Sequence, residues 1–191
     1  MRYRHFDQPY NLADFEPIHR HWISIGWHTI DGIERMEVIA DAWEAKFGSK
    51  FGIWGADPVF PAPSRSWDIS PLYSLGERAE AIEAEFTMKM LVAFRRCVPR
   101  GERLLAIGHW QRQWYEFDPH GPITEATRDE WAQAILPDEA THFLAGDLRF
   151  GTHGDWRGKI TIFGRELFAA LEADPPREFL RVCHSIPRAD A

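Results

Sequence analysis

Residues 146–158 form the part of the sequence richest in side chains that could do chemistry. Four glycines, several charged residues, a histidine and a tryptophan crowd into this segment. Glycine tolerates positive φ angles and lets another chain or a ligand approach the backbone closely. His153 is flanked by Asp147 and Asp155, carboxylates that could tune its pKa for work as a general base.

We identify eight candidate ligand- or partner-binding residues, six in this segment and two in the preceding proline-rich stretch. The same pattern also fits a plain connecting loop whose solvated Asp–Arg pairs are each worth about 0–1 kcal/mol. The spacing is not diagnostic, so ligand or partner contact, catalysis and a purely structural loop all stay open, and no catalytic residue is assigned. The eight candidates are Asp147, Arg149, His153, Asp155, Trp156, Arg157, Trp67 and Asp68.

Nine histidines raise the question of a metal site, and the sequence predicts none. His19 and His21 would share one side of an extended chain, but zinc needs a third or fourth ligand and no suitable spacing follows. His109, Asp118 and His120 are separated along two expected strands, so their convergence on one ion is not supported.

The sequence also gives little indication of cysteine chemistry or of cofactor binding. Cys97 and Cys183 lie far apart and suggest reduced thiols. Cys97 falls on the apolar stripe of an expected helix and is interpreted as a small buried hydrophobe. Cys183 and His184 are adjacent, which is poor geometry for a nucleophile and its base on a strand. No phosphate-loop, dinucleotide, nucleophile-elbow or zinc-protease motif is present, so we expect no cofactor.

Composition limits the class of protein. The 191 residues carry 22 Lys and Arg against 29 Asp and Glu, so the formal charge is 22 − 29 = −7, which argues against nucleic-acid binding. No apolar run is long enough to span a membrane, and no signal peptide is recognisable, so a cytoplasmic protein is expected. We expect one domain over residues 1–191, with 1–30 as a candidate peripheral segment, and the oligomeric state stays open.

Two helices have clear signals. Apolar residues recur at helical spacing from Ile33 to Phe47, after a capping box of Asp31 and Glu34 and before a terminating Gly48. A second stripe, the strongest in the sequence, follows the capping box of Ser74 and Glu77. That stripe consists of Ile82, Phe86, Met90, Ala93 and Cys97.

After residue 101 the apolar period changes from helical to strand-like. Residues 102–120 indicate two paired strands, and residues 140–147 and 159–164 indicate two more, joined by a turn-rich connector. Residues 127–136 fit either a capped helix or a short strand, and residues 164–174 indicate a short helix before Pro175 and Pro176, after which residues 178–183 are a candidate final short element. The order predicts an α+β fold, a mostly antiparallel sheet with helices packed on one face.

Three stretches together resemble a known but uncharacterised bacterial family, domain of unknown function 2716. They are PAPSRSWDIS at 61–70, ERLLAIGHWQRQWYEFDPH at 102–120 and GDLRFGTHGDWRGKITIFGREL at 146–167. The resemblance spans about residues 43–171 in broken pieces and favours a strand at 131–136. The chain departs from the family pattern at 109–112, where His-Trp-Gln-Arg replaces Asp-Trp-Gln-His. The family implies a fold group and no activity. Its matching positions are Pro63-Ser64, Asp68-Ile69-Ser70, Phe117-Asp118-Pro119, Gly151-Thr152, Gly154, Trp156 and Phe163-Gly164.

The favoured functional hypothesis is a non-enzymatic protein-binding module, with toxin-neutralising immunity as its specific form. Its basis is the acidic balance, the nine tryptophans and the missing catalytic motifs. The alternative is a small-molecule-binding protein or hydrolase-like enzyme using residues 147–157, which requires Asp147, His153 and Asp155 to converge in a cleft. A third hypothesis is self-association through exposed tryptophans. Trp43 and Trp131 are expected in the core, and Trp27, Trp54, Trp67 and Trp156 are the candidates for exposure.

Overall fold

The computed structural model describes most of the chain. The described residues are 22–50, 57–108, 114–128, 131, 134–135, 141–155, 157–182 and 184–186. Several residues singled out in the sequence lie outside them, namely His19, His21, Trp54, His109, Trp156 and Cys183.

The described strands form one antiparallel sheet of eight strands in the order β1-β4-β3-β5-β6-β7-β2-β8. Strand β3 pairs with β4, and β5, β6 and β7 follow one another in sequence order, as hairpin connections require, whereas β3 also pairs with β5 on its other side. Strand β2 comes from the proline-rich segment and joins the far side of β7. The strands are β1 His28–Thr29, β2 Ser64–Asp68, β3 Leu104–Gly108, β4 Trp114–Phe117, β5 Thr141–Ala145, β6 Gly151–Asp155, β7 Lys159–Phe163 and β8 His184–Ile186.

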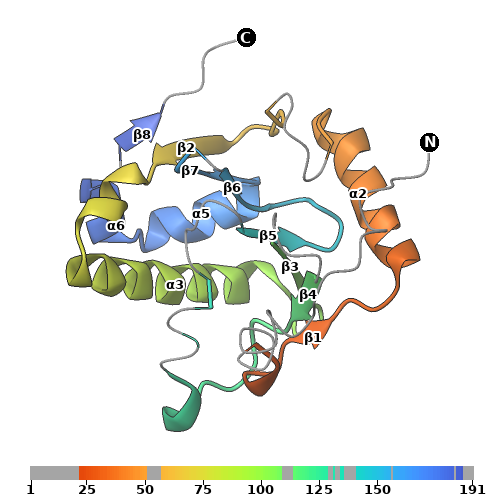
Figure 1. Cartoon of the computed structure of the whole chain (residues 1–191), viewed down its shortest axis with the longest axis horizontal. Helices are drawn as coiled ribbons and strands as arrows, with labels where there is room; N and C mark the ends of the chain where they lie inside the picture. The colour runs from red at the N-terminus through yellow and green to blue at the C-terminus, as the bar shows by residue number, and fades with distance from the viewer. Residues whose placement is uncertain are drawn as a thin grey trace.

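Helices cover both faces of this sheet (Figure 1). Helices α3 (Glu77–Cys97), α5 (Arg165–Ala173) and α6 (Arg177–Val182) lie together on one face. Helix α2 (Ile33–Phe47) stands on the other side of the strands. The predicted α+β class with an antiparallel sheet is therefore confirmed, and the structure adds α2 on the second face. Short helical turns η3 (Ser70–Ser74) and η4 (Glu125–Thr127) complete the described elements.

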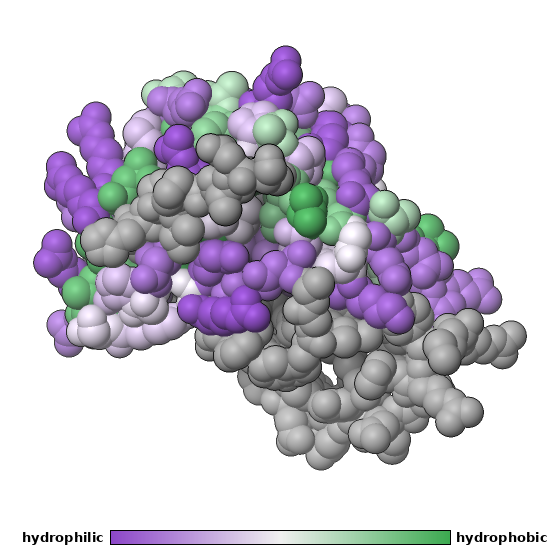
Figure 2. Space-filling model, turned by 90° about the horizontal axis from the view of Figure 1, so that it is seen from above, coloured by the Kyte–Doolittle hydropathy of each residue, from purple (hydrophilic) through white to green (hydrophobic). Residues whose placement is uncertain are grey.

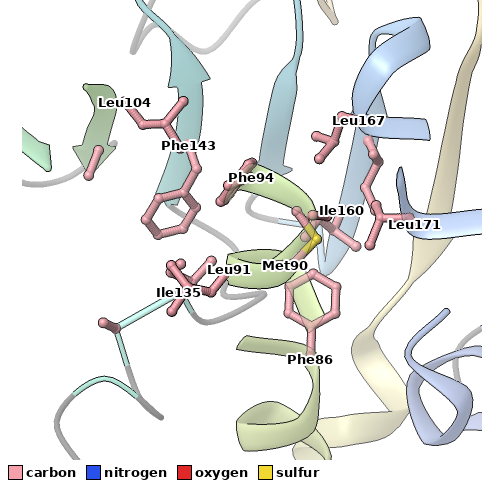
Figure 3. Close-up of a cluster of buried hydrophobic side chains, with 14 of the residues drawn as sticks. Phe86, Met90, Leu91, Phe94, Leu104, Ile135, Phe143, Ile160, Leu167 and Leu171 are labelled. Carbon is pink, nitrogen blue, oxygen red and sulfur yellow. The ribbon is translucent and has the colours of Figure 1, made fainter. Parts of the chain in front are cut away.

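The larger core lies between α3 and the sheet. Phe86 and Met90 project from α3 and are at most 1% exposed, as the apolar stripe predicts, and Phe94 is equally buried beside them. Figure 3 shows them facing Phe143 of β5 and Ile160 of β7, with α5 closing the cluster from the side. The alternation of strand side chains puts every second residue of β3, β4, β5 and β7 into this core.

The remaining strand residues form a second core under α2. Trp43 and Phe47 of that helix are buried and pack tightly, with ring centroids 4.5 Å apart. They meet Leu105, Leu144 and Phe163 from the opposite pleat of the sheet. Ile33 was expected on this buried stripe, but it is 45% exposed because the helix begins at that residue and its first turn overhangs the core.

Both predicted capping boxes are wrong, although the helices themselves are confirmed. Glycines occupy the N-cap positions of α2 and α3, and no side chain caps either helix. Asp31 instead accepts a hydrogen bond from the Thr29 hydroxyl, and the Ser74 hydroxyl donates to the Pro71 carbonyl. The predicted stop at Gly48 is confirmed, with its N–H bonded to the Glu44 carbonyl.

Two further expectations are corrected in the second half of the chain. The turn-rich connector between β5 and β7 contains β6, a strand in the middle of the sheet. The family-like strand at 131–136 is not formed at the residues that are described there, because Trp131 is helical and residues 134–135 lie in a turn. Of the two structures predicted for residues 127–136, a helix or a strand, Trp131 adopts the helix.

The tryptophans expected at the surface are buried where they are described. Trp27 is 2% exposed and stacks on Phe117 at 4.6 Å, so residues 22–30 contribute to the main core. Trp67 is 6% exposed. Trp43 and Trp131 are in the core, as predicted. Aromatic bulk in this chain therefore fills the interior on both sides of the sheet.

Candidate functional site

Strand β6 decides how the predicted site residues are distributed. Asp147 and Arg149 lie in the turn before it, His153 lies in its middle, and Asp155 ends it. A five-residue strand is about 13 Å long between its first and last Cα atoms, at about 3.3 Å per residue. The two aspartates therefore sit at opposite ends of the sheet, and the convergence of Asp147, His153 and Asp155 that an enzyme would need does not form.

The first end is organised by Arg149. The Asp147 carboxylate accepts hydrogen bonds from the Arg149 backbone N–H and guanidinium, both at 3.1 Å. The same guanidinium pairs with Glu166 at 3.2 Å and Glu102 at 3.6 Å, and it donates to the Cys97 carbonyl at 3.3 Å. Arg149 thus ties the end of α3, the segment before β3, the β5–β6 turn and the start of α5 into one cluster.

This cluster sets the titration of Asp147 and Cys97. Burial alone would raise the pKa of Asp147, but hydrogen bonds and charge from Arg149, with Lys46, hold that pKa below its usual value. Burial, with the Glu166 charge, raises the pKa of the Cys97 thiol to about 11. Cys97 is therefore protonated at neutral pH, which supports its interpretation as a small hydrophobe.

His153 lies against a second histidine that sequence reasoning missed. His142 of β5 is its cross-strand partner, and the two rings stack with centroids 4.5 Å apart and planes 10° apart. His142 is 1% exposed. Trp43 of α2 lies 5.9 and 5.6 Å from the His142 and His153 rings, and Phe60 lies 5.3 Å from His153.

The stacked pair is not arranged to bind one metal ion. A ligating imidazole holds the metal close to its own ring plane, and two nearly parallel planes cannot share an ion in that way. Within the described part of the chain, no group of three or more metal-ligating side chains comes together. The pair is part of the packing under α2.

The second end of β6 gathers more of the predicted residues. Asp155 accepts hydrogen bonds from the backbone N–H groups of Arg157 and Lys159, at 2.8 and 3.1 Å, and so fixes the β6–β7 turn. The Arg157 guanidinium bonds both carboxylate oxygens of Asp57, at 3.0 and 3.1 Å. Lys159 also approaches Asp57 and Asp155.

Asp68 joins the same end from β2. Its carboxylate accepts from the backbone N–H and hydroxyl of Ser70, at 3.0 and 2.6 Å, and starts the turn η3. The Ile69 N–H donates to the Gly158 carbonyl at 2.7 Å, which docks η3 on the β6–β7 turn. Tyr73 of η3 is 59% exposed there.

The structure thus brings Asp155, Arg157 and Asp68 together and leaves Asp147 and Arg149 at the other end. Trp67, next to Asp68, points to the opposite face of the sheet, where its ring lies 6.1 Å from Phe179 and 5.9 Å from the Arg65 guanidinium. Among the site residues that sequence reasoning missed, His142 and Lys159 could have been identified from the sequence. Tight turns on either side of a strand at 151–155 would have paired them with His153 and Asp155.

The fold and this geometry define an α+β protein with helices on both faces of an antiparallel sheet and polar turns at each end of its central strand. The chain belongs to the family described as Protein of unknown function (DUF2716), whose model matches residues 41–168. The resemblance noted in the sequence is confirmed.

A curated relative also lacks a known activity. The uncharacterized protein YxiI of Bacillus subtilis (strain 168) is 31% identical over 121 residues, which is 61% of this chain and 74% of YxiI. No solved structure matches the chain significantly. Among the described helices, none is both long and apolar enough to cross a membrane.

Proposed function

We propose that this protein is a non-enzymatic protein-binding module, and that its specific role is to neutralise a toxin as an immunity protein. The observation that supports this most is the exposed ring of Tyr73 at the start of an acidic helix. We call this surface the Tyr73 face and define it by Asp57, Tyr73, Glu77, Glu80 and Arg157.

Tyr73 is held in place while its ring stays accessible. It belongs to η3, which is docked on the β6–β7 turn through the Ile69–Gly158 hydrogen bond. Gly158 lets the Tyr73 ring pack closely against the turn, because a Cβ on that glycine would lie only 3.4 Å from the ring edge. An exposed tyrosine on a rigid turn can contribute a large contact area to a partner at a small entropic cost.

The charge around Tyr73 is negative. Residues 77–85, at the start of α3, hold four glutamates and one arginine. Glu77 and Glu80 are exposed there, and Arg78 lies 3.8 Å from Glu178, which offsets its charge. Together with the net charge of −7, this field favours a basic partner and speeds its encounter with the face.

The wider surface supports a polar interface rather than a hydrophobic one. Seen from above, the described residues are mostly hydrophilic, with small and scattered hydrophobic areas (Figure 2). Non-obligate interfaces have this character, with a few aromatic anchors inside a polar surround. The enzyme alternative lacks comparable support, because Asp147 lies in the turn before β6 while His153 and Asp155 lie in the middle and at the end of that strand.

The test begins with the genes next to this one in its host, and where one of them encodes a toxin, the domain carrying its toxic activity is the partner used. Co-expressed wild-type protein is expected to restore growth and to co-elute with the purified toxin domain in gel filtration. Tyr73→Ala is expected to weaken binding by about thirtyfold or more, the size of a hot-spot loss, and to abolish protection. Glu77→Lys with Glu80→Lys should slow association and reduce its salt dependence.

Val38→Ala on α2 is the matched control, because Val38 is similarly exposed at 67% but lies on the other face of the sheet. It should bind and protect like the wild type. If the protein binds its partner but does not protect the cell, the proposed protein-binding role would stand and the proposed immunity role would be overturned. Failure of the wild type to bind any protein recovered from its host, with Tyr73→Ala behaving identically, would overturn both.

A further inference from the structure

A small pocket opens between the sheet and the two C-terminal helices, on the face opposite α2. Its volume is about 70 Å³. Trp67 and Ile162 form its floor on β2 and β7, Phe168 lines it from α5, and Phe179 and Leu180 line it from α6. Trp67, Ile162 and Phe179 are also part of the main core, so the floor of the pocket is rigid.

Two charged side chains stand at this otherwise apolar pocket, Arg65 and Glu172. The Arg65 guanidinium lies over two aromatic rings, 5.4 Å from the Phe168 centroid and 5.9 Å from the Trp67 centroid. The ion pairs formed within the described part of the chain include neither Arg65 nor Glu172. Stacking therefore orients the guanidinium at the pocket while its N–H donors stay available to an anion.

The size of the pocket restricts what it can hold. A buried cavity of about 150 Å³ accepts benzene, so about half that volume suits an aliphatic group of three or four carbons. An aliphatic group of this size with a carboxylate nearby would satisfy both the apolar floor and Arg65, since guanidinium and carboxylate form strong paired hydrogen bonds.

We propose that this pocket is a binding site for a short branched aliphatic carboxylate, with the alkyl group against Trp67 and Phe179 and the carboxylate on Arg65. Such a group occurs in free aliphatic amino acids and at the C-terminus of a peptide ending in leucine. Glu172 distinguishes the two sources, because only a free amino acid brings an ammonium group that this carboxylate can pair with. The proposal stands independently of the Tyr73 face.

The experiment titrates the isotope-labelled full chain with 4-methylpentanoate and follows the Trp67 indole N–H and the leucine methyl signals by NMR. Saturable shifts confined to the pocket are expected, and the matching alcohol, 4-methylpentan-1-ol, should bind at least about tenfold more weakly. Arg65→Met keeps the stacked stem and removes the charge, so it should lower affinity for the acid by a similar factor. Arg181→Met, an exposed arginine on the same helix as Leu180 but outside the pocket, should change nothing.

Leu180→Trp, at a partly exposed position, fills the pocket mouth and should abolish binding while the circular dichroism spectrum stays unchanged. Free leucine binding more tightly than 4-methylpentanoate, with the advantage lost in Glu172→Gln, would assign the amino acid as the source. Tighter binding of acetyl-Gly-Gly-Leu, unaffected by Glu172→Gln, would assign the peptide C-terminus. Equal binding of acid and alcohol, equal binding by Arg65→Met, or no saturation by any of these probes would overturn the proposal.

Discussion

Strand β6 has the same triplet, Asp-x-Arg, in the turn before it and at the start of the turn that follows it, and the two copies make different contacts. In each copy the aspartate carboxylate accepts a hydrogen bond from the backbone N–H of the arginine, at 3.1 Å for Asp147 and Arg149 and at 2.8 Å for Asp155 and Arg157. This contact is a side-chain turn that depends only on neighbouring residues. The local chemistry of the two ends is therefore the same.

The side chains of the two arginines, Arg149 and Arg157, make different contacts. Arg149 pairs with three carboxylates and a carbonyl from four parts of the fold, and it covers the ring of Phe150. Arg157 pairs with Asp57 at the surface, where half of the arginine side chain stays exposed. The comparison teaches that the motif fixes a turn, whereas the elements packed around it decide whether its charges hold the fold together or stay at the surface for a partner.

The largest expected difference between the two ends comes from their glycines. At the first end, a Cβ on Gly151 would lie 2.5 Å from the Phe143 carbonyl oxygen and 2.7 Å from the Leu144 side chain, inside a paired ladder. Gly151→Ala should therefore lower the free energy of unfolding by about 3 kcal/mol, the upper end of overpacking costs. At the second end, Gly158→Ala meets a positive φ and milder approaches of 3.3 Å to Ser70 and 3.4 Å to the Tyr73 ring, and should cost about 1 kcal/mol.

Urea unfolding of both variants, followed by tryptophan fluorescence, measures this difference. The slope of unfolding free energy against urea should be the same for both, since neither change alters the surface exposed on unfolding. Equal losses of stability would show that the two turns are equally constrained, and the comparison would fail.

The arginines themselves give a smaller contrast. Arg149→Met removes several partly screened ion pairs and a charged hydrogen bond, and should destabilise the fold by about 1–2 kcal/mol. Arg157→Met removes an exposed pairing with Asp57 and should stay within about 0.5 kcal/mol of the wild type. Thermal unfolding at two salt concentrations checks both, because added salt should narrow the gap. A larger loss for Arg157→Met would mean that the second end also holds the fold together.

The sequence was sufficient for those elements whose signal is local and periodic. The stripes of α2 and α3, the β3–β4 pair and helix α5 were all predictable, because 3.6- and 2-residue periods report directly on burial. The family resemblance added the fold group and the span of the match, and the structure and comparison agree with both.

The sequence was insufficient where long-range packing decides. Residues 151–155 read Gly-Thr-His-Gly-Asp, which has low strand propensity, yet β5 and β7 enclose them and impose a strand. That error turned a central strand into a loop and hid the His142–His153 stack. The capping boxes failed for a related reason, since a favourable Ser or Asp near a helix start does not fix which residue enters the helix first.

The smallest effect, and the one that isolates charge from turn geometry, is the pH dependence of Asp147→Asn. Asparagine keeps an oxygen that can accept from the Arg149 N–H, so the substitution removes mainly the charge. The pKa of Asp147 is lowered in the fold, mainly by Arg149 acting against burial, whereas the unfolded chain titrates near its usual value of about 4. Folding therefore favours the ionised form. The stabilisation is present above about pH 4 and is lost as the pH falls through the native pKa.

At pH 7 the variant should be less stable by a few tenths of a kcal/mol, because the exposed pair is screened by solvent. The difference should shrink as the pH falls through the lowered native pKa of Asp147, because the native carboxylate is then protonated as well. Repeating the substitution in the Arg149→Met background should remove most of the pH-dependent part, which a double-mutant cycle measures directly. A pH-independent difference, or one that survives without Arg149, would show that the first end of β6 depends on its turn alone, as the second end does.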